Sequence, residues 1–220
     1  MASTSIPSTP SSVTPGTPPD MPGAPHEYEM QQHYGTRARA ERFYRDQVLD
    51  HLNAGMREFV ARQEMLFVAT SDRLGECDAT FRAGPPGFVL VVDEHRLAWP
   101  EYRGNGVMAS LANLGKNPHA GLLFIDFTES LIGLHVNGRA QILTDEAMRD
   151  GLASVPEVTV PGQLPQQWVL LNVEEAYIHC AKHIPRLRRV PRERVWGTDD
   201  MRRKGGDFFG VKAGRDAPGQ

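Results

Sequence analysis

The stretch that most constrains the fold is residues 131–143, where apolar and polar side chains alternate along a full strand length. Leu134, Val136, Gly138, Ala140 and Ile142 fall on one side of this stretch, and the polar residues between them fall on the other. Successive side chains of a β-strand point to opposite faces, so a period of two predicts a strand with one buried face.

Further strands are predicted wherever a short apolar run ends in turn residues. These runs are residues 65–71, 77–83, 88–92, 97–99, 122–125 and 168–180. Helical spacing occurs at 36–52, 56–63 and 107–114, and Thr144 with the acidic residues after it predicts a helix N-cap. A doubly wound sheet would need a helix after almost every strand. The pattern therefore favours a mainly β (α+β) protein: an antiparallel, nearly closed barrel of six or seven strands with flanking helices.

The two ends of the chain differ in composition from the middle. Residues 1–30 hold seven of the 17 prolines, and no lysine or arginine precedes Arg37, so we expect a disordered tail and no mitochondrial presequence. Residues 191–220 are basic and then glycine-rich, as in a loose arm. The folded domain is expected between residues 36 and 190.

Charge and cysteine content narrow the class of protein. The formal net charge of −3 gives no long-range attraction to nucleic acid or to an anionic membrane. Residues 182–204 carry nine Lys/Arg against three Asp/Glu, but Trp196 is their only aromatic residue, so a solvated tail or an arm on a partner subunit is favoured over nucleic-acid binding. Cys77 and Cys180 form no motif, and no apolar run is long enough to span a bilayer, so we expect a cytoplasmic protein.

The loop at residues 101–106 is the first candidate for function. It follows a strand that Pro100 is expected to end, contains Arg103, Asn105 and two glycines, and precedes the helix expected at 107–114. Unpaired N–H groups at a helix start and an arginine nearby are what a phosphate group binds. A solvated turn of the same composition is the alternative.

At these residues the chain resembles the FMN-binding split barrels of the pyridoxamine 5′-phosphate oxidase-like family, in particular its uncharacterised actinobacterial-type members. The resemblance rests on four segments in the family's order: FVATSDRLGECDATFRAGPPGFV, LAWPEYRGNGVMASLANLGKNPHAGLLFIDF, LIGLHVNGRAQIL and AYIHCAKHIPRL. It implies that FMN lies in a groove between the two subunits of a homodimer, and that the protein is a flavin-dependent oxidoreductase acting on a small molecule.

The resemblance also implies a set of cofactor-binding residues, in three groups. Arg82 and Ala83 would border the flavin ring; Trp99, Pro100 and Glu101 would line the ribityl chain; Arg103, Asn105 and Ser110 would grip the phosphate. A C-terminal lysine, Lys182, would reach the site. Two of these residues could instead have a purely structural role. Arg82 could form an ion pair with a neighbouring carboxylate, and Trp99 could lie in the core or in an interface.

The sequence departs from the family pattern in two places. Relatives often carry an arginine two places after the loop asparagine, where this chain has Val107, and the C-terminal signature that holds the substrate of true pyridoxamine phosphate oxidases is missing. A non-catalytic flavin-binding module therefore remains an alternative, as does the same fold with a deazaflavin or haem.

No catalytic residue or metal site can be named from the spacing of residues. His179 and His183 are four apart, as metal ligands on one helix can be, but the segment reads as a strand end and no further ligands are evident. We therefore expect no metal.

Overall fold

The computed structural model describes residues 22–152, 155–158, 160, 162–192 and 194–216, and the chain divides into two compact units, residues 1–48 and 49–220. Most of the expected N-terminal tail, residues 1–21, lies outside the described residues. The remainder of that segment includes the start of a helix at Pro25.

The first unit is a pair of helices, α1 (Pro25–His33) and α2 (Arg37–Gln47), followed by the two-residue strand β1 (Val48–Leu49) at its boundary. The Tyr44 hydroxyl joins the helices by donating to Glu27 at 2.6 Å and accepting from Gln31 at 2.7 Å. Burial, together with the Glu27 carboxylate, raises the pKa of Tyr44 to about 12. The helix expected at 36–52 is therefore present but ends earlier, where the backbone becomes extended at Val48.

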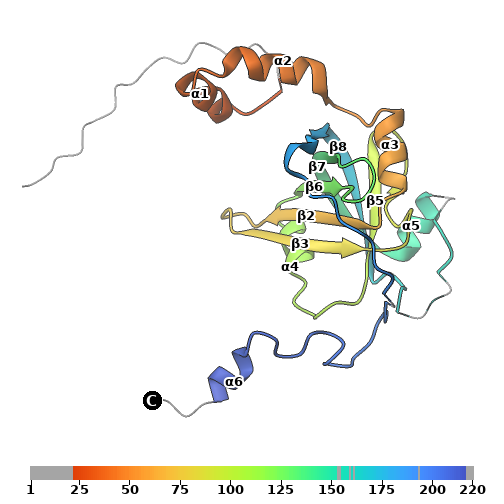
Figure 1. Cartoon of the computed structure of the whole chain (residues 1–220). Coiled ribbons are helices and arrows are strands. Elements are labelled where there is room, and N and C mark those ends of the chain that lie inside the picture. The colour runs from red at the N-terminus through yellow and green to blue at the C-terminus, as the bar shows by residue number, and fades with distance from the viewer. Residues whose placement is uncertain (1–21, 153–154, 159, 161, 193, 217–220) are drawn as a thin grey trace, which may run out of the picture. The chain divides into compact units, whose positions relative to one another are not determined.

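The second unit is built on one antiparallel sheet (Figure 1). Its strands are β2 (Met65–Ser71), β3 (Cys77–Ala83), β4 (Leu90–Val91), β5 (Arg96–Glu101), β6 (His119–Ile125), β7 (Gly133–Leu143) and β8 (Gln167–His179). They follow the order β3-β2-β6-β7-β8-β5-β4. The sheet curls into a half-barrel, which confirms the expected split-barrel α+β fold.

Pro100 does not end its strand as expected. It lies inside β5, opposite Trp168 of β8. Proline lacks an N–H donor and is tolerated in a sheet where no neighbour needs that donor. Such a place exists here, because β4 pairs with β5 only at Leu97 and Ala98 and leaves the flank of Pro100 without a strand.

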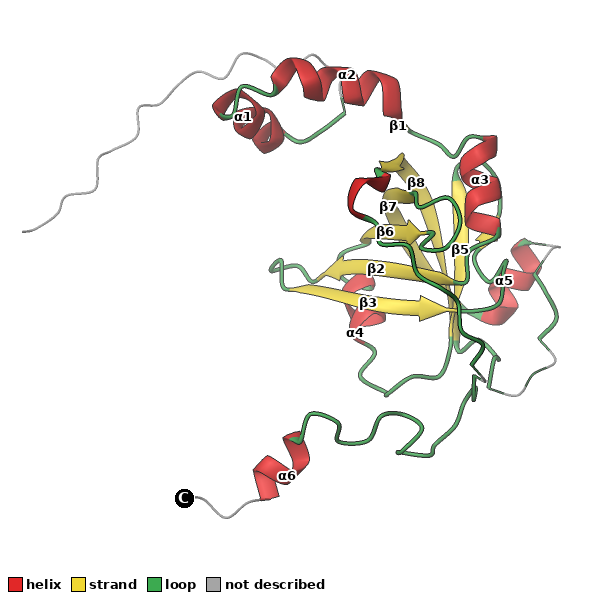
Figure 2. Cartoon of the chain, viewed as in Figure 1, coloured by secondary structure: helices red, strands yellow, loops and turns green. Residues whose placement is uncertain are grey.

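Helices cover parts of the half-barrel (Figure 2). They are α3 (Ala54–Ala61), α4 (Ala109–Leu114), α5 (Asp145–Gly151) and the 3-10 helix η1 (Ala181–His183). A further short helix, α6 (Val211–Asp216), lies on the C-terminal arm. The N-cap predicted at Thr144 is confirmed, since its side chain accepts the Ala147 N–H at 3.1 Å. Helix α4 packs against β2, β3 and β7 and so lies beside the start of the candidate site.

The core fills the concave side of the sheet. Its largest fully buried side chains include Trp99, Phe124, Leu66, Leu122 and Leu171, whose burial is the main favourable contribution to folding. The pairing of β7 with β8 is irregular between Asn137 and Gly138, because Glu174 is an extra residue on β8 at this point. A side chain at Gly138 would collide here with the carbonyl oxygen of Asn172. The alternation read from the sequence of 131–143 thus places Leu134, Val136 and Ala140 in this core.

The other side of the sheet carries a row of residues that face one another across five strands. We call it the outer aromatic row; it consists of Phe81, Phe67, Leu123, His135 and Tyr177. Phe81 and Phe67 meet edge to face at 5.5 Å and are 52% and 38% exposed, and His135 stacks on Tyr177 at 4.7 Å. The row therefore leaves large apolar side chains uncovered on the single chain.

His135 makes the stability of the fold depend on pH. Its Nε2 lies 3.0 Å from Nδ1 of His179, and burial, followed by the charge of His179, lowers the pKa of His135 below its ordinary value of 6.5. Between that lowered pKa and 6.5 the unfolded chain binds more protons than the folded one, so the free energy of unfolding falls as the pH falls. We expect His135→Gln to flatten the decline between about pH 7 and pH 5 in urea unfolding. An unchanged slope in the variant would contradict this origin.

Candidate functional site

A cavity of about 570 Å³ lies between strand β3, the end of β5, the loop that follows β5, and helix α4. Five of the nine residues expected at a cofactor site line it: Arg82, Ala83, Glu101, Asn105 and Ser110. Pockets of this volume hold drug-sized or cofactor-sized ligands. The tertiary structure therefore brings most of the expected residues to one place.

The cavity lies at the seam of the half-barrel. Strand β3 is the first strand in the sheet order and β5 is the sixth, yet Arg82 of β3 donates from Nε to both carboxylate oxygens of Glu101 in β5, at 2.9 and 3.0 Å. The side chains of this pair are 19% and 11% exposed. One ion pair thus ties the two ends of the curled sheet together.

Neighbouring groups hold this ion pair in place. Glu101 also accepts the indole N–H of Trp99 at 2.9 Å, and Arg82 donates to the hydroxyl of Thr80 at 2.7 Å. The remaining guanidinium nitrogen lies 3.4 Å from the hydroxyl of Ser110. The ion-pair alternative for Arg82 is therefore realised in the structure, and any ligand in the cavity meets a guanidinium that already has a carboxylate partner.

The loop before α4 is shaped by two residues with left-handed backbone conformations. Gly106 has φ +85° and Met108 has φ +58°, so the regular helix begins at Ala109, two residues later than expected. The Asn105 side chain accepts the N–H of Val107 at 2.9 Å, which uses one backbone donor that the sequence analysis had left for a phosphate. Helix α4 has six residues, too few for its dipole to attract an anion strongly.

Arg103 points toward the C-terminal arm. Its Nη2 lies 2.8 and 3.0 Å from the two carboxylate oxygens of Asp199. Beside it, the ring of Tyr102 meets the ring of Trp196 edge to face at 5.3 Å, and Trp196 lines the cavity. Burial raises the pKa of Tyr102, so its hydroxyl stays protonated at neutral pH.

Four of the nine expected residues do not line the cavity: Arg103, on the loop beside it, and three residues that lie elsewhere. Trp99 is fully buried in the core, which agrees with the structural alternative to a role in cofactor binding. Its contact with the site is the hydrogen bond from its indole N–H to Glu101. Pro100 borders a separate cavity of about 220 Å³. Lys182 follows the last residue of β8, whereas Glu101 pairs with Gln167, the first. Within one chain, Lys182 is therefore far from the cavity.

Further residues that were not expected from the sequence also line the cavity. Asp78 and Thr80 share with Arg82 one face of β3, and this two-residue spacing could have predicted them. Asp78 accepts a hydrogen bond from Ser110 at 3.2 Å. No pattern in the sequence predicts that Trp196 lines the cavity, because its position depends on how the C-terminal arm folds back onto the barrel.

Electrostatically, the cavity lining is slightly acidic. Asp78 and Glu101 carry two negative charges against the single positive charge of Arg82. A phosphate group would bring further negative charge into this partly buried space and needs an additional cation. The nearest cation on the loop is Arg103.

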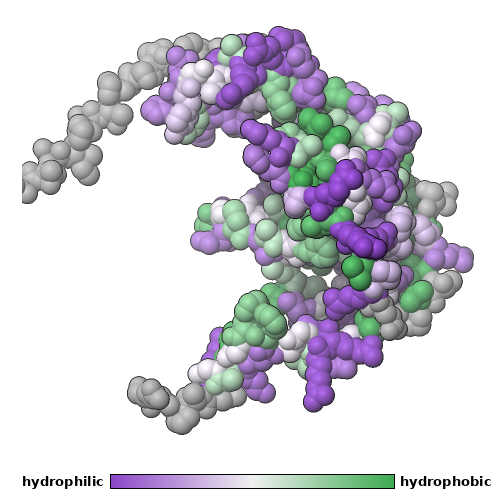
Figure 3. All heavy atoms as spheres, viewed as in Figure 1, coloured by the Kyte–Doolittle hydropathy of each residue, from purple (hydrophilic) through white to green (hydrophobic). Residues whose placement is uncertain are grey.

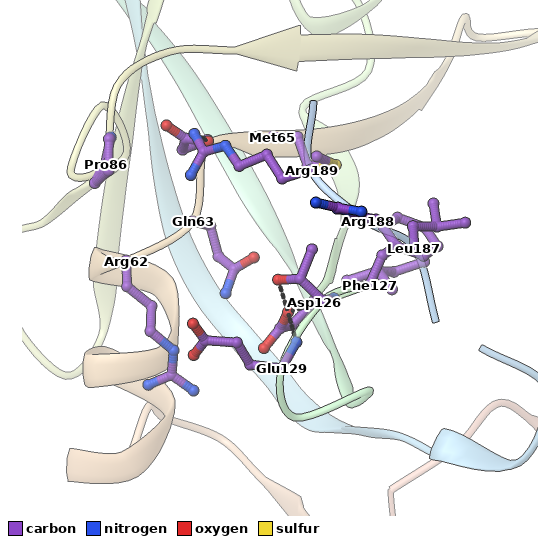
Figure 4. A pocket seen from close by; sticks show the side chains of 13 residues that line it. Arg62, Gln63, Met65, Pro86, Asp126, Phe127, Glu129, Leu187, Arg188 and Arg189 are labelled. Atoms are coloured by element: carbon purple, nitrogen blue, oxygen red, sulfur yellow. Dashed lines mark hydrogen bonds and ion pairs between the residues drawn. The ribbon is translucent and has the colours of Figure 1, made fainter. Parts of the chain in front are cut away.

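A second cavity, of about 370 Å³, lies beside the end of α3 and the turn between β6 and β7 (Figure 4). None of the expected site residues lines it. Arg62, Arg188 and Arg189 face Glu64, Asp126 and Glu129 there, so its charges balance. Backbone N–H groups of the turn hold the Asp126 carboxylate and lower its pKa against the effect of burial, which makes Asp126 part of the turn rather than a free ligand.

The described part of the chain offers neither a metal site nor a membrane-spanning helix. No cluster of three or more His, Cys, Asp or Glu side chains capable of holding a metal ion occurs there. Among the same residues, no helix has the length and apolar character required to cross a bilayer.

The half-barrel with a cavity at its seam defines the class of protein. The sequence model of the family described as pyridoxamine 5′-phosphate oxidase matches residues 52–180, more than half of the chain. The chain therefore belongs to the pyridoxamine 5′-phosphate oxidase family. The match spans β2 to β8 and stops before Lys182 and the arm.

Solved structures with similar folds share little sequence with this chain. They include a conserved hypothetical protein from Mycobacterium tuberculosis (14% identity, 66% of this chain and 92% of that chain, TM-score 0.44) and an FMN-binding protein from Syntrophomonas wolfei (10%, 70% and 96%, 0.40). HutZ, a haem storage protein from Vibrio cholerae, is a third (14%, 58% and 93%, 0.38). No curated protein matches the chain. Such distant likeness concerns the fold and not the ligand.

The ion pair at the seam gives a stability prediction. Glu101→Gln leaves the Arg82 guanidinium partly buried without a carboxylate, and we expect a loss of about 2–4 kcal/mol in the free energy of unfolding. Asp93→Asn is the matched control: it weakens the pair with Arg96, whose side chains are 42% and 40% exposed, and should cost about 1 kcal/mol or less. Chemical denaturation measures both. Equal losses in the two variants would show that the seam does not depend on this pair.

Proposed function

We propose that this protein binds FMN in the cavity at the barrel seam, at the interface of a homodimer, and acts as a flavin-dependent oxidoreductase on a small molecule. The observation that carries the proposal is the cavity itself. The cavity is lined by Arg82, Ala83, Glu101, Asn105 and Ser110. It lies beside β3, an edge strand of the barrel, within the residues that match the family. We also propose a cytoplasmic location, because Cys77 and Cys180 are exposed free thiols.

The residues present fit a flavin mononucleotide in size and in type of contact. Strand β3 pairs on one side only, with β2, so the backbone of Arg82 and Ala83 is available to border a planar ring. Ser110 and Asn105 supply a hydroxyl and an amide at the loop, and Arg103 supplies a cation at its outer edge. The negative charge of the phosphate is the feature that the site accommodates least well, because Arg82 already pairs with Glu101 and Val107 adds no cation.

A bound flavin would supply the electron or hydride transfer. The part of this chain is to bind and orient the ring and to keep water from it. We assign no side chain as a catalytic acid or base. Tyr102 offers an aromatic surface on the side of the cavity where a small substrate would enter.

The homodimer is supported by the outer aromatic row. Phe81 and Phe67 leave apolar surface exposed that monomeric proteins usually cover. The row begins on β3, the strand that also borders the cavity, so a second copy seated on the row would lie beside the ligand. Such a copy could also bring its Lys182 toward the site, which the chain's own Lys182 does not reach.

The visible spectrum of the freshly purified protein separates the proposal from its alternatives. Flavin absorption bands support FMN, a Soret band supports haem, and a deazaflavin is identified by mass after extraction. A colourless protein that does not bind added FMN would support a split barrel that has lost its cofactor. Activity is a separate question, tested by anaerobic reduction with NADPH or NADH followed by reoxidation.

Arg103 provides a prediction specific to the phosphate. We expect Arg103→Ala to weaken FMN binding by about 1.5–3 kcal/mol, the size of a charge-assisted hydrogen bond, and to leave riboflavin binding unchanged because riboflavin has no phosphate. Fluorescence titration measures both ligands. Arg73→Ala, in the turn at the other end of β3, is the control and should change neither. Unchanged FMN affinity in Arg103→Ala would remove the loop from the site.

The homodimer has its own test. Phe81→Glu places a charge at the β3 end of the outer aromatic row, and we expect the dimer dissociation constant to rise about 30-fold or more. Light scattering after size-exclusion chromatography measures the mass. Leu74→Glu is the control, since Leu74 is 87% exposed at the hairpin turn. A variant that stays dimeric to the same dilution as the control would place the interface elsewhere.

A further inference from the structure

The C-terminal arm contacts the rim of the cavity through residues 194–199. Arg194 donates to the carbonyl oxygen of Gly84 at 3.0 Å, Trp196 meets Tyr102, and Asp199 pairs with Arg103. These contacts come from a short segment beyond residue 180, where the family match ends. Further along, apolar side chains gather on the arm near α6 (Figure 3), including Phe208 and Phe209.

The charges around the loop leave no cation available to a phosphate in this state. In the cavity, Arg82 faces Asp78 and Glu101. At the loop, Arg103 faces Asp199, and the nearby Lys204 pairs with the same carboxylate at 3.6 Å. Around the cavity and the loop together, three cations (Arg82, Arg103 and Lys204) are already matched by three carboxylates (Asp78, Glu101 and Asp199), so a dianion placed here adds negative charge that no further cation of this group compensates, which is costly in a partly buried site. One carboxylate has to move before a phosphate can bind.

Asp199 is the carboxylate that can move. Glu101 is buried and is held by Arg82 and Trp99, whereas the Arg103–Asp199 pair is exposed at 57% and 68%. Exposed ion pairs contribute little, because water and salt compete for both partners. Breaking the contact therefore costs far less than opening the seam.

We infer that Asp199 is an internal competitor for the phosphate group of the ligand. In the absence of an anion, the arm rests on Arg103 and Trp196 closes the rim; a bound phosphate takes Arg103 and displaces Asp199. The inference rests on the proposed function in that it needs a phosphate-bearing ligand at this loop. It adds that ligand binding and release of the arm are coupled equilibria, so each one shifts the other.

The first test compares two ligands and two matched variants. Asp199→Asn removes the competing charge, and we expect FMN to bind about two- to fivefold more tightly while riboflavin binding stays unchanged. Asp200→Asn is the control, because Asp200 bonds to the arm's own backbone and to Arg203 rather than to Arg103. FMN affinity in Asp199→Asn that equals or falls below that of Asp200→Asn would overturn the inference.

The second test needs no flavin. Trp99 and Trp168 are buried, so acrylamide quenching of tryptophan fluorescence in the full-length protein reports mainly on Trp196. We expect inorganic phosphate to raise quenching above that in chloride of equal ionic strength, and Asp199→Asn to show the raised value from the start. No difference between phosphate and chloride would overturn the inference. If no variant binds FMN, the proposed function fails, and this measurement still decides whether an anion releases the arm.

Discussion

The half-barrel depends on the contact between Arg82 and Glu101. The two residues lie near opposite ends of the sheet, and their ion pair closes a seam that backbone hydrogen bonds leave open. A curled sheet with unpaired ends needs side chains to hold those ends in place. Here an arginine and a carboxylate do so, and the bond from Trp99 connects them to the core. The cavity exists because the seam is joined by two side chains and not by a strand.

This arrangement makes ligand binding depend on the same side-chain contacts that stabilise the fold. A ligand in the cavity contacts groups that already hold the fold together, since the Nε of Arg82 donates to both carboxylate oxygens of Glu101 and the charge of the guanidinium is already paired. Buried ion pairs of this kind stabilise little by their presence but are costly to break. Positive charge for an anionic ligand therefore has to come from outside the seam. Arg103 lies there, on an exposed loop and in contact with the arm.

The outer aromatic row and the arm both leave apolar groups uncovered on a single chain. Phe67 and Phe81 do so on the sheet, and Phe208 and Phe209 on the arm. The first pair lies on the family-matched barrel and the second beyond it. The barrel face thus lies within the part of the chain that matches the family, whereas the arm lies beyond it and contacts the loop that borders the cavity.

The amino-acid sequence determined the strands, the antiparallel class and much of the site, because these follow from local patterns. The alternation in 131–143, the runs at 65–71 and 77–83, and the Thr144 cap all appear as expected. Arg82, Glu101 and Ser110 could likewise be grouped from the family's segments. Pro100 was misjudged, because whether proline ends a strand depends on which neighbours flank it.

Only the tertiary structure decided which charges meet. Arg82 and Glu101 are 19 residues apart, and Arg103 and Asp199 are 96 apart. No local pattern encodes either pair, since each forms when the sheet curls or the arm returns. The same holds for Trp196 at the cavity and for Lys182 at the far end of β8. The periodic pattern that predicts a strand or a helix is present in neighbouring residues of the sequence. The pairing of charges in a site is established only when the chain folds and brings distant residues together.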